Sequence, residues 1–329
     1  MNMKHLSFLL FIGVLCVSCS DDYIGIPRSE PYESPSLKVS LNGKEVKVAR
    51  KYVMTHDLLV TLGPCGGNNL TQIKKLSYIP NQTDTISTDE NFCPTYYSAT
   101  DWIGPYWMRA QNNGNQNSGF TGGWHAYNGD FTGSPTARTI NVQAFLDGQL
   151  LEDGSNDVIC KNARIVVENL LQAGNTKEPD GSGREVLKET VTYNFYADTI
   201  AVSVASEALE DITIEIYYGL QSCFGGVARM FCADSVFTCR TDGYHGTMAR
   251  VHEVECTKDD GHQVVCKLDS VGLGTQDRYN RCEVDTNRQY CFTSPYGKTY
   301  FRLVGEVGLP LKKGQKTFWS GAYIFKESQ

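Results

Sequence analysis

The chain has 329 residues and a formal net charge of −7, with 41% hydrophobic and 20% charged residues. The acidic excess suits solubility but argues against a nucleic-acid partner, because nucleic acids are bound by basic surfaces. The length is enough for one large all-β domain or for two smaller domains.

The first twenty residues, MNMKHLSFLLFIGVLCVSCS, have the build of a cleaved export signal. Lys4 gives a basic start, and the apolar run 6–17 is too short to span a bilayer as a stable helix. The end of this run, LCVSC, resembles the lipobox of bacterial lipoproteins, although Cys16 stands where Leu is usual. The resemblance implies cleavage before Cys19 and a lipid anchor on this cysteine. The alternative is an ordinary signal peptide in which Cys19 occurs by chance.

The residues after Cys19 predict a surface-exposed protein on a tether. SDD at 20–22 resembles the acidic tag of lipoproteins that the Bacteroidetes place on the outer cell surface, although a solvated acidic linker would look the same. The segment 21–37 is rich in Pro, Ser and acidic residues, as flexible tethers are. We therefore expect a signal peptide at 1–18, a lipidated cysteine and tether at 19–37, and a single domain at 38–329. The outer membrane would be contacted through the lipid alone.

Alternating apolar residues predict strands from residue 37 onward. Asn42-Gly43 marks a hairpin turn within LKVSLNGKEVKVA, and Asp147-Gly148 marks another within TINVQAFLDGQLL. The segment 162–172 is compatible with a strand or with a short helix.

The strand pattern continues through the second half of the chain. Segment 185–209 contains two alternating runs, and segment 250–268 predicts a hairpin around the turn KDDG. Strands are expected again within 297–311 and at 318–325. Alternation within 211–222 places two sets of side chains on opposite faces of one strand. The first set is Ile212, Ile214, Ile216 and Tyr218, and the second is Thr213, Glu215 and Tyr217.

These elements define the expected fold class. No segment shows an amphipathic pattern of helical length, and the expected strands are too numerous for a small sandwich. We therefore predict an all-β fold, a large antiparallel sandwich of two sheets, in one continuous domain without an internal linker or repeat.

The cysteine count predicts disulfide bonds. Of the 12 cysteines, Cys16 and Cys19 lie in the signal region, and the others form an even set in an exported chain. Spacing favours neighbouring pairs, although the connectivity cannot be deduced from the sequence. The favoured pairs are Cys65–Cys93, Cys256–Cys266 and Cys282–Cys291, while Cys160, Cys223, Cys232 and Cys239 would share two more bridges. No C-x-x-C pair occurs, so we expect no zinc site. No H-E-x-x-H, P-loop or dinucleotide-binding motif occurs either, and we expect no cofactor.

The stretch FTGGWHAYNGD at 120–130 places aromatic and polar side chains between glycines. Trp and Tyr can stack on the apolar face of a sugar ring, and Asn, Asp, His and Arg can bond its hydroxyls. Glycines let the backbone approach a ligand. We therefore predict a binding region within 101–138, in loops on a rigid β scaffold. The candidate binding residues are Trp107, Arg109, Trp124, Tyr127, Asn128, Asp130 and Arg138, joined by Tyr217 and Arg278 from later segments.

His125 is the first candidate for a general acid or base, because histidine titrates nearest to neutral pH. Glu215 on its strand and His245 in the loop DGYHGTMAR are further candidate catalytic residues. Arg278 in QDRYNRC is suited to hold a carboxylate such as that of a uronic acid. A structural explanation stays open for each, since loop histidines often only form hydrogen bonds and charged residues often only face water.

The body of the chain resembles the galactose-mutarotase-like superfamily of large β-sandwiches. The resemblance rests on the strand-only pattern, the loop GGWHAYNG and the segment FWSGAYIF. That superfamily includes sugar epimerases, polysaccharide lyases and accessory domains of glycoside hydrolases. Its epimerases use two histidines and a carboxylate on a concave face, for which His125, His245 and Glu215 are the candidates here.

Two hypotheses from different classes follow. The first is a cell-surface lipoprotein that binds a carbohydrate through the loops at 101–138 and, if it is an enzyme, acts as a lyase, hydrolase or epimerase. The second is a non-enzymatic structural or adhesion protein whose aromatic loop contacts another protein. In a purely structural variant, Trp107 and Trp124 plug the open end of the sandwich. A groove with exposed rings and converging polar groups would favour the first hypothesis, and a flat apolar patch the second.

Overall fold

The computed structural model describes twelve ranges of the chain. These are residues 36–91, 95–97, 101–114, 119–127, 133–196, 198–223, 227–232, 235–238, 253–269, 274–275, 298–304 and 308–327. Within them the chain forms β-strands and one short 3-10 helix, η1 (Gly174–Thr176). No helix long and apolar enough to cross a membrane occurs in these ranges.

Three antiparallel sheets contain all the named strands. The first has six strands in the order β10 (Val158–Cys160), β1 (Leu37–Asn42), β2 (Glu45–Val53), β3 (His56–Cys65), β4 (Leu70–Pro80) and β5 (Thr95–Tyr97).

The second sheet is the largest, with eleven strands. Along its path lie β16 (Ser235–Thr238), β15 (Val227–Cys232), β17 (Glu253–Lys258), β18 (His262–Leu268), β22 (Lys316–Glu327), β13 (Thr199–Ala208), β12 (Glu185–Phe195), β11 (Ala163–Gln172), β8 (Ala137–Leu146) and β9 (Gln149–Leu150). Off the path, β19 (Gly274–Thr275) pairs with β22.

The third sheet has five strands and was not expected. Its order is β20 (Lys298–Val304), β14 (Ile212–Cys223), β6 (Tyr106–Ala110) and β7 (Phe120–Thr121), with β21 (Leu309–Leu311) also paired to β14. The all-β, antiparallel prediction is confirmed for the described residues, whereas the prediction of two sheets is wrong. Both edges of β14 are occupied by β6, β20 and β21, so β14 cannot continue the ladder of the larger sheet.

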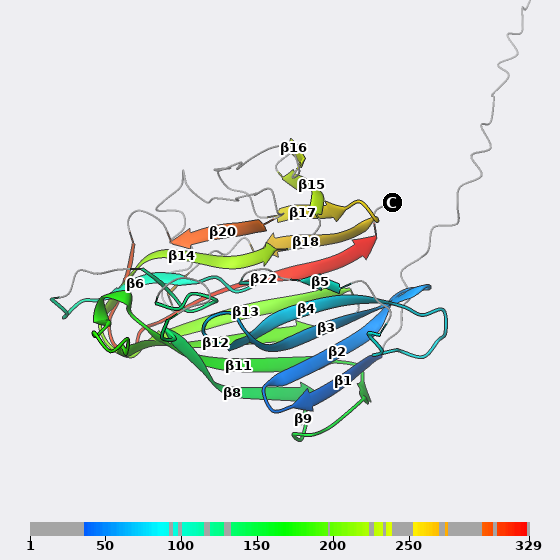
Figure 1. Ribbon diagram of the computed structural model, residues 1–329, viewed down its shortest axis with the longest axis horizontal. Coiled ribbons are helices and arrows are strands. Elements are labelled where there is room, and N and C mark those ends of the chain that lie inside the picture. Colours follow the sequence, from blue (N-terminus) through cyan, green and yellow to red (C-terminus); the bar gives the residue numbers. More distant parts are fainter. Residues whose placement is uncertain are drawn as a thin grey trace, which may run out of the picture.

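The main hydrophobic core joins the six-stranded and eleven-stranded sheets. Figure 1 shows β1–β4 lying in front of β8 and β11–β13. Val39 and Val60 of the first sheet belong to the same buried cluster as Ile165, Val191 and Val202 of the second. Each strand contributes alternate residues to this cluster, which is the period-2 pattern of a sheet with one buried face. The architecture is therefore a layered β-sandwich extended at one end by the third sheet.

Both predicted turns form, at or next to the positions that the sequence indicates. Gly43 has φ 57° between β1 and β2, and Asp147 and Gly148 have φ 47° and 85° between β8 and β9. Positive φ at both central residues, as at Asp147 and Gly148, belongs to the type I′ turn, whose twist matches the flanking strands. The first turn has Gly43 and Lys44 at its centre, one residue later than predicted, and only Gly43 has a positive φ. The segment 162–172, open between strand and helix, is strand β11.

The face assignment along β14 is wrong beyond Ile214. The pairing with β6 shifts register between Ile214 and Ile216, as a β-bulge does. A bulge inserts one residue and exchanges the two faces of the strand that follows. Tyr217 is consequently buried, and Tyr218 takes the half-exposed place beside Glu215 that was predicted for Tyr217.

The predicted Cys256–Cys266 bridge is absent, because neither cysteine forms a disulfide bond in the described residues. The hairpin around KDDG is present, but its register pairs Cys256 with Val264 and Cys266 with Val254. Diagonal positions in a ladder lie about 7–8 Å apart, beyond the usual span of a disulfide. Cys65 and Cys160 also form no disulfide bond within this part of the chain, and the remaining predicted partners lie outside the residues whose side chains are described.

Candidate functional site: an aromatic face on the third sheet

Three half-exposed rings from three strands meet on one face of the third sheet. Trp107 of β6 lies directly opposite Phe120 of β7, and their ring centres are 5.1 Å apart at an interplanar angle of 84°. Phe120 lies 5.4 Å from Tyr218 of β14. We call Trp107, Phe120 and Tyr218 the aromatic face. Edge-to-face and tilted contacts at these distances are favourable for aromatic rings.

His125 borders the aromatic face and is backed by a buried carboxylate. Its ring centre is 5.4 Å from that of Phe120, and its side chain is 25% exposed. The Nε2 atom lies 3.7 Å from Oδ2 of Asp101, whose side chain is only 1% exposed. A histidine with one side open to solvent and a carboxylate behind it has the arrangement of an oriented general acid or base.

Two glycines allow the loop to bring His125 and Asp101 together. Gly122 and Gly123 have φ 74° and 51°, a region that glycine enters without cost. A Cβ on Gly123 would lie 2.2 Å from Oδ1 of Asp101. The backbone N–H of Trp124 donates a hydrogen bond to the same oxygen. Gly123 therefore allows the backbone to approach a carboxylate closely, while Gly122 lies against Leu171.

The loop is also anchored from beneath by two buried polar residues. Nδ2 of Asn68 donates to the carbonyls of Gly123 and His125, each at 3.0 Å. Oδ1 of Asn68 accepts the N–H of Thr136 at 2.7 Å, and the Thr136 hydroxyl donates to the carbonyl of His125. Asn68 belongs to the turn between β3 and β4, so the first sheet fixes the position of the loop that follows β7 of the third sheet.

Charged side chains continue the same face. Nη1 of Arg109 lies 3.6 Å from Oε1 of Glu215, and the two side chains are 29% and 36% exposed. Arg302 of β20 pairs directly with Tyr218 and is half-buried. Predicted residues Trp107, Arg109, His125 and Glu215 thus share a surface with the rings.

Three other predicted residues lie elsewhere. The Trp124 ring packs directly on Gly66, where an added Cβ would come within 2.4 Å of the indole. The Tyr127 hydroxyl donates to Oε1 of Gln172 at 3.0 Å, and partial burial raises the pKa of this phenol. Arg138 forms a two-point contact with Glu185 on the outer surface of the largest sheet. None of these contacts includes a ring of the aromatic face.

Tyr217 belongs to a buried network behind the aromatic face. Its ring stacks on Tyr106 at 3.9 Å, and its hydroxyl accepts a hydrogen bond from Nε1 of Trp319 at 2.7 Å. The Tyr106 hydroxyl donates to Oε2 of Glu189 at 2.9 Å. Burial raises the pKa of Glu189, opposed by hydrogen bonds from Asn169 and Tyr106. Tyr217 is therefore a core residue, and its predicted contact with substrate is wrong.

The remaining candidates, Asn128, Asp130, His245, Arg278 and Cys19, lie outside the described residues. Sequence reasoning missed Asp101, Phe120 and Tyr218 as members of the site. Phe120 stood in the quoted stretch FTGGWHAYNGD, and Asp101 heads the neighbouring run DWIGPYW. The position of Asp101 directly before an aromatic-rich run is the one sequence signal that could have drawn attention to it.

The described residues contain no group of three or more His, Cys, Asp or Glu side chains placed to hold a metal ion. The aromatic face and its neighbours offer binding and acid–base chemistry. The rings can stack on a ligand, and beside them lie a histidine backed by a carboxylate and an Arg–Glu pair.

No protein-family model and no curated sequence matches the chain. Among solved structures, the galactosidase domain of an α-galactosidase-sucrose kinase is similar over 88% of this chain and 42% of its own, at 11% identity and a TM-score of 0.46. A galactose 1-epimerase from Lactobacillus acidophilus NCFM covers 89% of this chain and 98% of its own, at 9% identity and a TM-score of 0.39. A galactose mutarotase-like protein from Clostridium acetobutylicum gives the same coverages, 10% identity and a TM-score of 0.37. These scores are too low to support an argument about family or activity, so the superfamily resemblance stays a prediction.

Proposed function

We propose that this protein binds a carbohydrate at the aromatic face. The observation that carries the proposal is the contact of three half-exposed rings, Trp107, Phe120 and Tyr218, with one another and with His125. Rings held in this way present an apolar surface that remains open to solvent. The apolar face of a sugar ring is suited to such a surface, because stacking removes both from water without burying hydroxyl groups.

The polar neighbours of the rings suit the hydroxyl rim of a sugar. Arg109 supplies N–H donors and Glu215 supplies acceptors from one ion pair, while the His125 imidazole has one nitrogen of each kind when neutral. A sugar hydroxyl both donates and accepts, so mixed donors and acceptors beside an apolar platform match its chemistry. The anchoring of His125 by Asn68 keeps these groups in place before a ligand arrives.

Chemistry at this face, if the protein is an enzyme, would be proton transfer centred on His125. Asp101 orients the imidazole, and Glu215 adds a second carboxylate on the same surface. Epimerisation, elimination and glycoside hydrolysis all need a positioned acid or base. The reaction class therefore lies among the epimerases, lyases and hydrolases.

We further infer that the protein works at the outer cell surface, held by a lipid on Cys19. Support comes from the apolar run, the sequence LCVSC and the acidic residues that follow it. Labelling cells with a clickable fatty acid should mark the wild type and leave Cys19→Ala unmarked. Protease added to intact cells should remove the protein, and protection from protease would contradict surface exposure.

A glycan array followed by affinity electrophoresis tests the binding proposal. Trp107→Ala and Phe120→Ala should weaken retention by any glycan that binds the wild type by roughly tenfold, since each removes a stacking ring. Phe231→Ala is the matched control, because Phe231 is a 47% exposed ring on β15 of a different sheet. Unchanged retention of both variants would refute the aromatic face as the binding surface.

The same glycan then separates binding from catalysis. Reducing-end and unsaturated-product assays, together with NMR of the anomeric protons, report hydrolysis, elimination and epimerisation in turn. If turnover is found, His125→Ala should abolish it while Trp107→Ala mainly raises the substrate concentration required. A bound glycan that stays chemically unchanged identifies a binding protein.

A further inference from the structure

A second candidate binding site lies on the outer surface of the eleven-stranded sheet, away from the aromatic face. A hollow of about 170 Å³ opens where β8, β11 and β12 lie side by side. An engineered cavity of about 150 Å³ accommodates benzene, so the hollow has room for a ligand of one ring. Its lining includes Phe145, Asn162, Arg164, Asn194 and Tyr196. We call it the Arg164 hollow.

Strand register explains why these side chains converge. Phe145 of β8 lies opposite Arg164 of β11, and Arg164 lies opposite Asn194 of β12. Residues directly opposite in neighbouring strands point to the same face of a sheet. The next row, which contains Ala163 and Phe195, is buried in the core and forms the floor.

The guanidinium of Arg164 is held in place without being neutralised. Its Cζ atom lies 4.3 Å from the centre of the Phe145 ring, a cation–π contact that fixes the plane of the group. Arg109, Arg138 and Arg184 each face a glutamate. In the described part of the chain, no carboxylate stands within ion-pair distance of Arg164. Stacking through its face leaves the N–H edge of the guanidinium available to a ligand.

Asp147, in the turn beside the hollow, is already engaged by backbone donors. Asp147 accepts the backbone N–H groups of Lys161 and Asn162 at 2.9–3.2 Å. These hydrogen bonds lower the pKa of Asp147 and hold its carboxylate on the turn. The N–H groups of the Arg164 guanidinium are therefore available to the carboxylate of a ligand.

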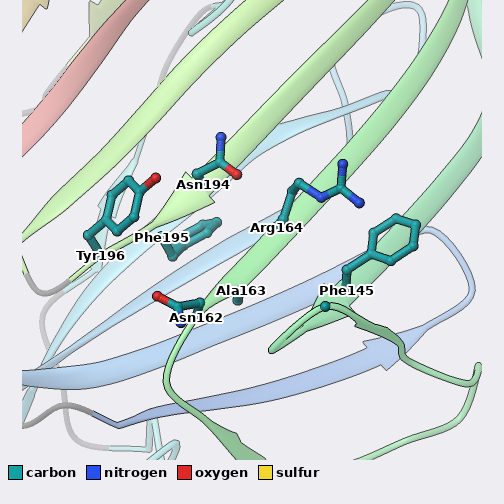
Figure 2. A pocket seen from close by; sticks show the side chains of 8 residues that line it. Phe145, Asn162, Ala163, Arg164, Asn194, Phe195 and Tyr196 are labelled. Carbon is teal, nitrogen blue, oxygen red and sulfur yellow. The ribbon is translucent and has the colours of Figure 1, made fainter.

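The remaining lining matches the rest of such a ligand. Tyr196 is 51% exposed, an unusually open position for a large ring. Figure 2 shows Arg164 and Phe145 on one side of the hollow and Tyr196 on the other, with Asn162 and Asn194 between them. The Tyr196 ring offers a stacking surface, and the two amides offer both donors and acceptors for hydroxyls.

We propose that the Arg164 hollow binds a carboxylate carried by a ring, with the carboxylate on Arg164 and the ring against Tyr196. Two sources share this chemistry, a uronic acid residue of a glycan and a free aromatic acid. Bidentate contact between guanidinium and carboxylate gives selectivity over a neutral ring of the same size. The site is independent of the aromatic face and of the activity proposed for it.

Titration calorimetry of the full chain with three probes tests this proposal: methyl galacturonide, neutral methyl galactoside and benzoate. We expect saturable binding of a carboxylate probe that depends on Arg164, whereas any binding of the neutral galactoside belongs to the aromatic face and should be lost in Trp107→Ala but not in Arg164→Gln. Arg164→Gln should weaken binding roughly tenfold or more, because a charge-assisted hydrogen-bonded pair is lost. Arg164→Lys should recover only part, since an ammonium lacks the planar fork.

Matched controls make the outcome decisive. Arg138→Gln removes an exposed arginine of β8 that is already engaged by Glu185, and should leave the affinity unchanged. Trp107→Ala should also leave it unchanged, which separates this site from the aromatic face. Binding of benzoate alone, lost in Arg164→Gln, would support the site and identify an aromatic acid. Equal affinity of Arg164→Gln for the carboxylate probes, no binding of either carboxylate, or binding of the neutral galactoside that Arg164→Gln weakens equally would overturn the proposal. The far-ultraviolet circular dichroism of each variant reports whether it remains folded.

Discussion

The two faces of β6 and β14 carry similar side chains in different surroundings. On the inner face, Tyr106 and Tyr217 are fully buried and stack at 3.9 Å. On the outer face, Trp107 and Tyr218 flank Phe120, and all three rings are half-exposed. Neighbouring residues of the same strands therefore serve as core on one side and as open surface on the other.

The difference lies in how the polar atoms of the rings are satisfied. Inside, the hydroxyls of Tyr106 and Tyr217 are bonded to Glu189 and Trp319. Outside, the half-exposed rings contact one another beside His125 and an Arg–Glu pair. Buried hydroxyls must find partners within the protein, whereas surface rings remain free to exchange water for a ligand. The inner face should therefore govern stability, and the outer face binding.

Removing a buried ring of β22 that packs against the inner face should have the largest effect. Trp319 is 1% exposed and donates its indole N–H to Tyr217. Trp319→Ala should lower the free energy of unfolding by about 3–5 kcal/mol, through lost burial and the cavity left behind. Urea denaturation measures this loss. A change no larger than that of Trp107→Ala would contradict the division between the two faces.

The loop that carries His125 should be the next most sensitive. Gly123→Ala would place a Cβ 2.2 Å from Oδ1 of Asp101 at a φ of 51°. We expect a loss of about 1–3 kcal/mol from strain and from displacement of the loop. Glycan retention should fall as well, because His125 moves with the loop.

Gly43→Ala is the control that separates the effect of the steric clash with Asp101 from the effect of backbone strain in Gly123→Ala. Gly43 also has a positive φ, 57°, but an added Cβ would meet no atom within 4 Å. Its substitution should cost only the conformational penalty, about 1 kcal/mol, and leave retention intact. Equal losses for the two variants would show that the Asp101 contact is unimportant.

The sequence predicted strands far better than it predicted faces and pairings. The hairpins at Asn42-Gly43 and Asp147-Gly148 follow from local turn chemistry and period-2 alternation, and both are present. The bulge at Ile214–Ile216 depends on packing between β14 and β6, so alternation alone assigned Tyr217 to the wrong face. The Cys256–Cys266 bridge was also mispredicted because the sequence does not reveal strand register. In the hairpin the two cysteines are offset by two residues, which separates their sulfurs.

The candidate site was predictable only in part, because some of its contacts join residues far apart in the sequence. Rings and a histidine within 101–130 indicated a binding surface, and Trp107, Arg109, His125 and Glu215 do lie together. Asp101 was invisible as a partner of His125, because two glycines with positive φ bring them together. Trp124 was assigned to the ligand but packs on Gly66, a residue 58 positions earlier in the chain. Such long-range contacts leave no periodic signal in a single sequence.

The inner face also carries a pH dependence of predictable sign. Burial raises the pKa of Glu189, so the folded state holds its proton more tightly than the unfolded state. The free energy of unfolding therefore falls as pH rises from the unfolded pKa, about 4.3, through the raised folded pKa. Glu189→Gln removes this titration, so its stability relative to the wild type should increase between pH 4 and pH 7.

Glu168→Gln is the control with the opposite sign. The hydrogen bond from Lys188 lowers the pKa of Glu168, with a further contribution from Asn141. Stability from this pair is present above the unfolded pKa and is lost as pH falls through the folded pKa. The Gln variant should therefore lose stability relative to the wild type as pH rises from the lowered folded pKa of Glu168 to the unfolded pKa, about 4.3, with no further change towards pH 7. Parallel pH profiles for Glu189→Gln and the wild type would contradict the raised pKa.

The smallest effect on stability is expected for the ring at the edge of the aromatic face. Trp107 is half-exposed and contacts Phe120 at 5.1 Å, so Trp107→Ala removes little buried area and leaves no closed cavity. We expect a loss of about 1 kcal/mol or less in urea denaturation, against the larger loss for buried Trp319. A loss as large as that of Trp319→Ala would make Trp107 a core plug and remove the basis for sugar recognition. A stable variant that no longer retains the glycan would show that this ring is kept at the surface for its ligand.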